Sequence, residues 1–139
     1  MAVESLNPYL HYNGNAAEAI QLYEQALGAK VNGVMHYSDM PGQTFSDEHK
    51  QRVMHANLSI GSSALMLADD MPNAPSPASN GQVLVNFTDG DSMVKSFHEM
   101  ASGGTVVLAL HNTFWGARFG IVVDRFGISW AFHGPKMEA

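Results

Sequence analysis

The sequence predicts an α+β fold made of two modules, each with the order strand, helix and three strands. The chain has 139 residues, of which 45% are hydrophobic and 14% charged, the length and balance of one globular domain. The elements expected before a proline-rich segment at 71–81 recur in the same order after it. A shift of 75 residues also lays Ala19, Leu22, Ala26, Gly28 and Val31 on Val94, Phe97, Ala101, Gly103 and Val106.

A strand and a helix open the first module. Residues 6–12 mix aromatic and apolar positions and stop at the turn signal Asn13-Gly14, which predicts a strand. Asn15 is the expected cap of the next helix, with Glu18 three residues later as in a capping box. We expect this helix to end at Gly28, because glycine adopts the left-handed conformation at a helix terminus without a steric penalty. Its apolar positions recur at helical spacing, at Ile20, Tyr23 and Leu27.

Three strands complete the first module. Residues 31–37 are typical of a strand, whereas the polar segment 38–51, which contains proline and glycine, predicts a loop. Residues 54–60 and 64–68 are two further apolar runs separated by the turn residues 61–63. This arrangement predicts a hairpin.

The second module repeats the first after a connection. The segment 71–81 carries three prolines among small and polar residues, so it is expected to join module 1, at about 1–70, to module 2, at about 82–139. A strand at 83–88 precedes a helix whose expected cap is Asp91. The other expected elements are the end of this helix at Ser102 with a glycine stop at Gly103, and strands at 105–110, 119–123 and 129–133, the last two flanking a turn at 124–127.

Composition and charge exclude several classes of function. The absence of cysteine excludes thiolate zinc sites, cysteine nucleophiles and disulfides. The formal net charge of −6 has the wrong sign for holding a phosphate backbone, so neither nucleic acid nor an anionic membrane is an expected partner. No P-loop, G-x-S-x-G or G-x-G-x-x-G motif is present, which argues against P-loop ATPases, hydrolases with a nucleophile elbow and Rossmann oxidoreductases. Without a secretory pattern or a run of about 18 apolar residues, we expect a cytoplasmic protein.

Alternation along the strands gathers polar residues on one face of the expected sheets. Tyr9 and His11 share a face of the first strand, His55 and Asn57 share a face of a later one, and His133 has the matching position in module 2. The apolar residues that alternate with these polar ones lie on the other face, which suits packing under a helix. A polar sheet face is either solvated or lines a ligand cleft. Histidines in such a cleft serve as metal ligands or proton shuttles, whereas a single histidine is more often structural.

Two further groups have both a structural and a functional interpretation. Asp69-Asp70 closes the last strand of module 1, where paired acids either cap a turn or hold a cation. Phe114 and Trp115 belong to an aromatic stretch between two strands. These rings either cover the core or form, with Arg118, the wall of a pocket that accepts an anion.

Short motifs spread over nearly the whole chain suggest a family. They lie at residues 7–10, 14–15, 27–28, 55–58, 65–69, 113–115 and 124–130. Together they resemble the PhnB-like group of the glyoxalase, bleomycin-resistance and extradiol-dioxygenase superfamily, also called vicinal oxygen chelate proteins. The resemblance implies paired βαβββ modules that form a cupped mixed sheet of the glyoxalase-like type, usually in a homodimer.

The resemblance also implies where a metal ion would bind. Metal-dependent members hold a divalent ion with His, Gln or Glu on the first and last strands of each module, and the matching positions here are Asn7, Met66, Val83 and Ala131. Three of these side chains cannot ligate a hard ion, so the usual metal centre is expected to be absent. Metal-dependent glyoxalase or dioxygenase chemistry then loses its main source of charge neutralisation. Some PhnB-like proteins are labelled demethylubiquinone methyltransferases, but no nucleotide-binding signature for a methyl donor is present.

These observations leave three hypotheses. The first is a dimeric protein without metal or cofactor that binds a small molecule, or an enzyme of unknown substrate. Its flat, polar-edged ligand would contact Tyr9, His11, His55, Asn57, Phe114, Trp115 and Arg118. The second is a metal-dependent lyase or oxygenase with a relocated site formed by His11, His55 and either Asp69 or His133. The third is a resistance-type protein that sequesters a drug without chemistry.

Overall fold

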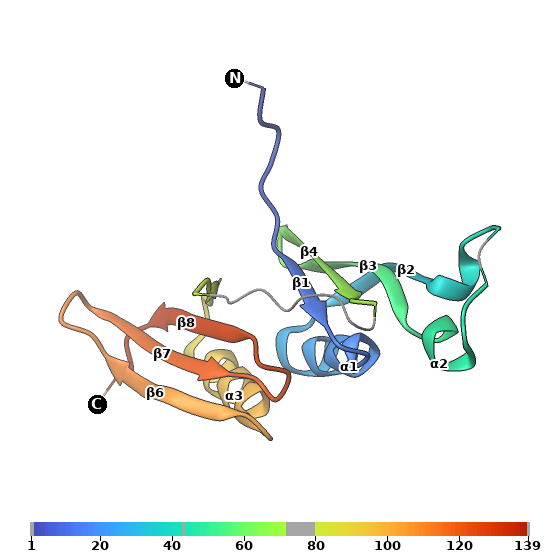
Figure 1. Ribbon diagram of the computed structural model, residues 1–139. Helices are drawn as coiled ribbons and strands as arrows, with labels where there is room; N and C mark the ends of the chain where they lie inside the picture. Colours follow the sequence, from blue (N-terminus) through green and yellow to red (C-terminus); the bar gives the residue numbers. More distant parts are fainter. Residues whose placement is uncertain (1, 43, 72–79, 139) are drawn as a thin grey trace. The chain divides into compact units, whose positions relative to one another are not determined.

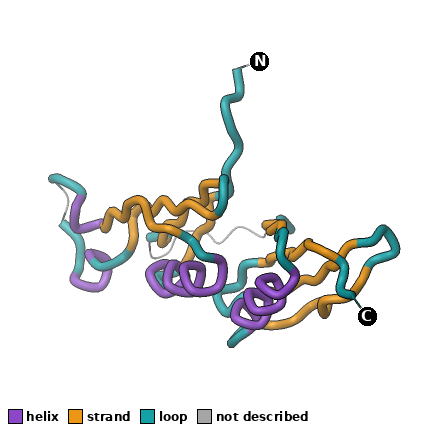
Figure 2. The backbone as a smooth tube through the Cα atoms, turned by 180° about the vertical axis from the view of Figure 1, so that it is seen from behind, coloured by secondary structure: helices purple, strands orange, loops and turns teal. Residues whose placement is uncertain are grey.

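Helices and strands follow the predicted order in the computed structural model, which describes residues 2–42, 44–71 and 80–138. The chain divides into two units, Met1–Pro77 and Ala78–Ala139. Each unit holds one four-stranded mixed sheet with a long helix against one of its faces (Figures 1 and 2). The predicted α+β class with two βαβββ modules is therefore confirmed. The expected connection at 71–81 falls largely on residues 72–79, outside the described residues.

Unit 1 contains the first sheet. Its strands pair in the order β1-β4-β3-β2, with β1 parallel to β4 and the other neighbours antiparallel. The main elements are β1 (Tyr9–Tyr12), α1 (Ala16–Leu27), β2 (Lys30–His36), β3 (Val53–Ile60) and β4 (Ser63–Asp69). Strand β1 starts three residues later than predicted, after Pro8. Proline has no N–H for the sheet, although the Pro8 carbonyl still accepts a hydrogen bond from the Met66 amide at 3.1 Å.

Helix α1 begins and ends where predicted, but its cap differs from the prediction. The side chain of Asn15 makes no capping hydrogen bond. The carboxylate of Asp69 accepts from the amides of Gly14 and Ala16, both at 2.9 Å, and so serves the helix start from the end of β4. Gly28 is left-handed at the other end, as expected. The helix therefore depends on a residue that is distant in the sequence.

The predicted loop at 38–51 contains two short helices. A 3-10 turn, η1 (Tyr37–Asp39), follows β2 directly, and α2 (Asp47–Lys50) precedes β3. The hydroxyl of Ser46 accepts from the His49 amide at 3.3 Å and caps α2. The loop prediction was wrong here because it gave most weight to Pro41, Gly42 and the polar character of the segment, whereas one capping serine suffices for a single helical turn.

Unit 2 repeats this architecture, with strand order β5-β8-β7-β6 and β5 parallel to β8. Its elements are β5 (Val83–Asn86), α3 (Gly90–Ala101), β6 (Thr105–Asn112), β7 (Ala117–Val123) and β8 (Ser129–Pro135). Helix α3 packs on the sheet through the buried side chains of Met93 and Phe97. Gly134 permits this approach, since a Cβ there would lie 2.8 Å from the sulfur of Met93.

The cap of α3 and the offset of the internal repeat differ from the sequence prediction by one or two residues. The cap of α3 is Asp89 rather than Asp91, because the Asp89 carboxylate accepts from the Ser92 amide at 3.1 Å. The internal repeat holds, but within the helices the offset is 74 residues. Buried positions Ala19, Tyr23 and Ala26 then match buried Met93, Phe97 and Met100.

Candidate functional site

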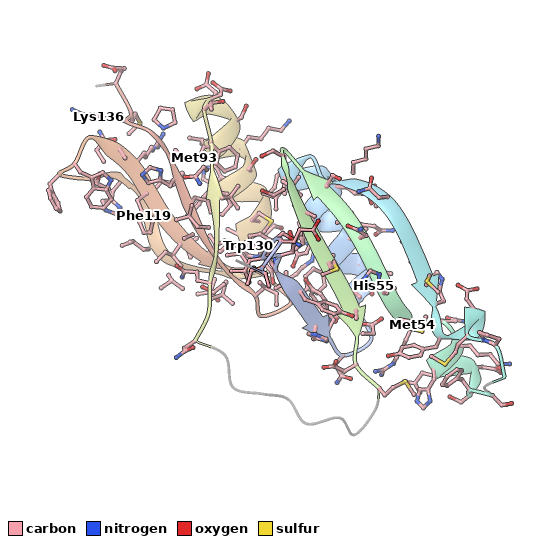
Figure 3. All side chains as sticks on the ribbon, turned by 90° about the horizontal axis from the view of Figure 1, so that it is seen from above. Met54, His55, Met93, Phe119, Trp130 and Lys136 are labelled. Carbon is pink, nitrogen blue, oxygen red and sulfur yellow. The ribbon has the colours of Figure 1, made fainter. Side chains whose placement is uncertain are left out.

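Three aromatic side chains meet on the open face of the unit 1 sheet, the face opposite α1. The ring of Tyr9 lies 4.6 Å from the ring of His11 and 5.8 Å from the ring of His55, measured between centroids. Figure 3 looks onto this face, with α1 behind the sheet and His55 on its strand. We call Tyr9, His11 and His55 the ring cluster. Alternation along the strands predicted that these residues share a face, and the structure brings them into contact.

The register of the sheet explains why the cluster forms. Tyr9 pairs with Met66 across β1 and β4, and Met66 pairs with Asn57 across β4 and β3. Residues paired in this way point to the same face, so Asn57 also lies on the open side, where it is exposed. The Nε2 atom of His55 is 3.4 Å from the sulfur of Met66. The cluster thus draws on β1 and β3, with β4 between them.

A carboxylate and a guanidinium border the cluster at the end of β4. The Nδ1 atom of His11 lies 2.9 Å from Oδ1 of Asp70. Arg52 donates from Nη1 to the carbonyl oxygen of Asp70 at 2.7 Å and to Oδ1 of Asn13 at 3.2 Å. Sequence reasoning considered Asp70 only as part of an acidic pair and did not single out Arg52. The parallel pairing of β1 with β4, which places Asp70 beside His11, is not visible in the local pattern.

The neighbouring carboxylate, Asp69, has a structural role and does not fit the relocated metal site. It is 2% exposed, and besides its two bonds at the start of α1 it accepts from the Val53 amide at 2.9 Å through Oδ2. Both oxygens are therefore held by backbone amides. Among the described residues, no group of three or more His, Asp or Glu side chains is arranged to hold a metal ion. The proposed ligand set His11, His55 and Asp69 was wrong in its aspartate.

Tyr37 lies at the same end of unit 1, beside the end of β4. Its hydroxyl donates to the carbonyl oxygen of Asp69 at 3.0 Å, and its ring packs edge-on against Phe45 at 5.5 Å. Partial burial raises the pKa of this phenol, and the negative charges of Asp70 and Asp69 raise it further. Tyr37 thus remains a neutral hydrogen-bond donor to high pH.

The raised pKa of Tyr37 predicts a loss of stability at alkaline pH. An ordinary phenol ionises near about pH 10, so above that pH the unfolded chain releases a proton that the folded chain retains. The contribution of Tyr37 is complete below this pH and disappears as the pH rises through the folded pKa. We expect the urea midpoint of the wild type to fall more steeply above pH 10 than that of Tyr37→Phe. If the urea midpoints of the two proteins fell equally with pH, the alkaline loss of stability would not come from the raised pKa of Tyr37.

The candidate residues of unit 2 form a different arrangement from the expected one. Phe114 and Trp115 lie in the turn between β6 and β7, are 98% and 57% exposed, and contact each other edge-on at 5.1 Å. Arg118 pairs with Gly134, whose missing side chain would point at Met93 of α3. Arg118 therefore lies on the helix side of the sheet, and its buried Nε has no hydrogen-bond partner in the described part of the chain. Among the described residues, no hydrogen bond or cation–π contact links Arg118 to either ring.

The strand register shows which residues stand at the positions that match the superfamily's metal ligands. Strand β1 begins after Asn7, and Tyr9 is the residue beside Met66. Val83 pairs with buried Trp130, whereas Leu84 pairs with Ala131, so Leu84 rather than Val83 shares the face of Ala131. Tyr9 and Met66 offer a phenol and a thioether, whereas Leu84 and Ala131 offer only alkyl groups. This donor set does not fit a hard divalent ion.

Comparisons with known proteins agree with this fold. The family model of the Glyoxalase/Bleomycin resistance protein/Dioxygenase superfamily matches residues 5–132. Protein YjdN of Escherichia coli is 29% identical, over 96% of this chain and 97% of its own. The crystal structure of protein PA1353 from Pseudomonas aeruginosa is 34% identical with a TM-score of 0.86, covering 97% of this chain and all of that one. A putative 3-demethylubiquinone-9 3-methyltransferase, the PhnB protein of Bacillus cereus, shares the fold at 19% identity, a TM-score of 0.76 and coverage of 94% and 99%.

None of the helices in the described part of the chain has the length and apolar character of a membrane span.

His133, the other suggested ligand of a relocated metal site, lies half-buried on β8 in unit 2. It is on the face opposite Phe132, as the alternation predicted.

Proposed function

Because the chain belongs to the glyoxalase/bleomycin resistance protein/dioxygenase superfamily, we propose that it is a PhnB-like protein that binds a small molecule without the usual metal centre of the superfamily. The ligand lies on the open face of the unit 1 sheet. Tyr9, His11 and His55 contact it through their rings, and Asn57 adds an amide on the same face.

The observation that carries this proposal is the ring cluster itself. Tyr9 contacts both imidazole rings on the open face of the unit 1 sheet, and the three rings offer a surface for stacking and for hydrogen bonds from the ring edges. The combination suits a planar ligand with polar groups at its edge, such as an aromatic carboxylic acid or a hydroxylated heterocycle.

A binding experiment with planar probes tests the proposal. We expect at least one of 4-hydroxybenzoate, nicotinate and indole-3-acetate to shift the ring proton resonances of His11 and His55 in a saturable way. Tyr9→Ala and His55→Ala should each weaken that binding by about tenfold, since loss of one stacked or hydrogen-bonded group corresponds to roughly 1.4 kcal/mol.

The matched control is His98→Ala, which removes an exposed histidine from α3 in unit 2. This variant should bind as the wild type does. Circular dichroism verifies that the variants are folded. Probes that leave both histidines unchanged, or that bind equally well to the Tyr9 and His55 variants, would disprove the proposed site.

Three finer predictions from the sequence belong to this proposal. They are the homodimer, the cytoplasmic location and the contribution of Phe114, Trp115 and Arg118 to ligand binding. The drug-sequestering hypothesis, in which a drug is held in a dimer cleft, involves no chemistry. The distinction between holding and converting a ligand therefore rests on whether the site can move a proton.

A further inference from the structure

His11 and Asp70 form a pair with the geometry of a proton acceptor and its partner. The distance between Nδ1 of the imidazole and Oδ1 of the carboxylate is 2.9 Å, and about half of the His11 side chain is accessible. A carboxylate only accepts hydrogen bonds, so Nδ1 must carry the proton in this contact. The neutral imidazole therefore has its lone pair on Nε2, the atom that has no partner among the described residues.

The backbone that carries the Asp70 carboxylate is held by hydrogen bonds on both sides of its Cα. Its amide donates to the carbonyl oxygen of Tyr12 at 2.7 Å, and its own carbonyl accepts from Arg52 at 2.7 Å. Arg52 is itself restrained by Asn13 and lies 3.6 Å from Glu48. This backbone is fixed before any ligand arrives, which is the condition for orienting a base without further reorganisation.

The ring of Tyr9 also packs against the same imidazole. Its centroid is 4.6 Å from that of His11 with the planes tilted by 32°, so the imidazole contacts both an aromatic ring and a carboxylate. The other charged or titratable groups around this end of unit 1 include His55, Tyr37, Arg52, Glu48 and Asp69. Of these, Asp69 is fully occupied by backbone amides, and Tyr37 donates to a carbonyl. Of these described groups and His11, His11 is the one that combines exposure with an acidic partner within hydrogen-bond distance.

We infer that His11 and Asp70 are a proton-accepting pair that takes the proton from a weakly acidic hydroxyl group of the bound ligand, such as a phenol or an enol. The ligand O–H bond breaks with its electron pair left on oxygen, and an N–H bond forms at Nε2 of His11. The imidazolium is stabilised by the Asp70 carboxylate and faces the new oxyanion. This inference rests on the proposed function and adds to it the class of ligand and the role of each residue.

The strength of the base defines this ligand class. A neutral imidazole accepts protons efficiently from groups whose acidity is close to its own, which includes activated phenols and enols. An unactivated C–H bond is far less acidic. The pair therefore selects ligands that bind as oxyanions, with Asp70 as a positioning residue that acts through His11.

The test uses p-nitrophenol, whose anion absorbs visible light and whose ionisation falls near neutral pH. We expect binding to the wild type to lower the apparent pKa of the probe by about one unit, a tenfold change in ionisation. Asp70→Asn should abolish most of this shift. Asp47→Asn removes the same charge from a fully exposed position in unit 1 and should retain it.

A second measurement needs no ligand. Nitrogen-15 spectra of the free wild type should show neutral His11 protonated on Nδ1, and Asp70→Asn should give a mixture of tautomers. Binding of the probe at the ring cluster without a change in its ionisation, or a wild-type His11 protonated on Nε2, would overturn the pair but leave the proposed function standing. Absence of any binding at the cluster would overturn both.

Discussion

Replacing Asp69 by alanine should lower the free energy of unfolding by about 4 kcal/mol, since each buried donor left without an acceptor costs about 1–3 kcal/mol. Its carboxylate accepts from the amides of Gly14 and Ala16 through Oδ1 and from the amide of Val53 through Oδ2, all at 2.9 Å. The side chain is 2% exposed, so water cannot replace it without rearrangement. Urea denaturation followed by circular dichroism measures the loss.

The adjacent carboxylate provides the control. Asp70→Ala changes the same charge one residue away but removes only a partly exposed contact with His11, so its effect should stay below about 1 kcal/mol. Asp69→Asn should be intermediate, because an amide oxygen can accept while the amide nitrogen faces a backbone N–H. Equal losses for the alanine variants at positions 69 and 70 would show that the carboxylate of Asp69 does not tie α1 to the sheet.

The capping of α1 shows why the sequence could predict the helix but not what holds its start. Apolar spacing and a terminal glycine are local signals, and they gave the bounds of α1 correctly. The capping prediction used the nearest suitable side chain, Asn15. The residue that serves the first turn is 53 positions further along the chain from Ala16 and reaches it only through the pairing of β1 with β4. A local pattern holds no information on that pairing.

The same reasoning separates the predicted from the unpredicted parts of the site. Alternation within β1 and β3 needs only the sequence, so it placed Tyr9, His11 and His55 on one face. The partner of His11 is 59 residues away and depended on the sheet order. Arg118 was misplaced for a different reason. Strand β7 was expected to start at Phe119 but starts at Ala117, which moves Arg118 from a loop into the alternating pattern, on the helix side.

Unit 2 has its own buried aspartate, Asp124, at the turn that precedes β8. Its Oδ1 accepts from the amides of Phe126 at 2.9 Å and Ile128 at 3.1 Å, and its Oδ2 accepts from the indole nitrogen of Trp130 at 2.9 Å. The sequence predicted this turn from its Asp and Gly residues, but the bond to the tryptophan was not foreseen. One carboxylate thus fixes both the turn and the largest side chain of the unit 2 core.

We expect Asp124→Ala to destabilise the protein by about 4 kcal/mol, because two turn amides and a buried indole N–H lose their acceptor. Trp130→Phe should cost about 3 kcal/mol, from the lost volume and from the Oδ2 atom that it deprives of the indole donor. The double variant should cost less than the sum, since the two single variants both remove the same indole bond. Asp91→Ala, at an exposed position in the first turn of α3, is the control and should stay below about 1 kcal/mol. Strictly additive losses would show that the contact between Asp124 and Trp130 contributes nothing to the stability of unit 2.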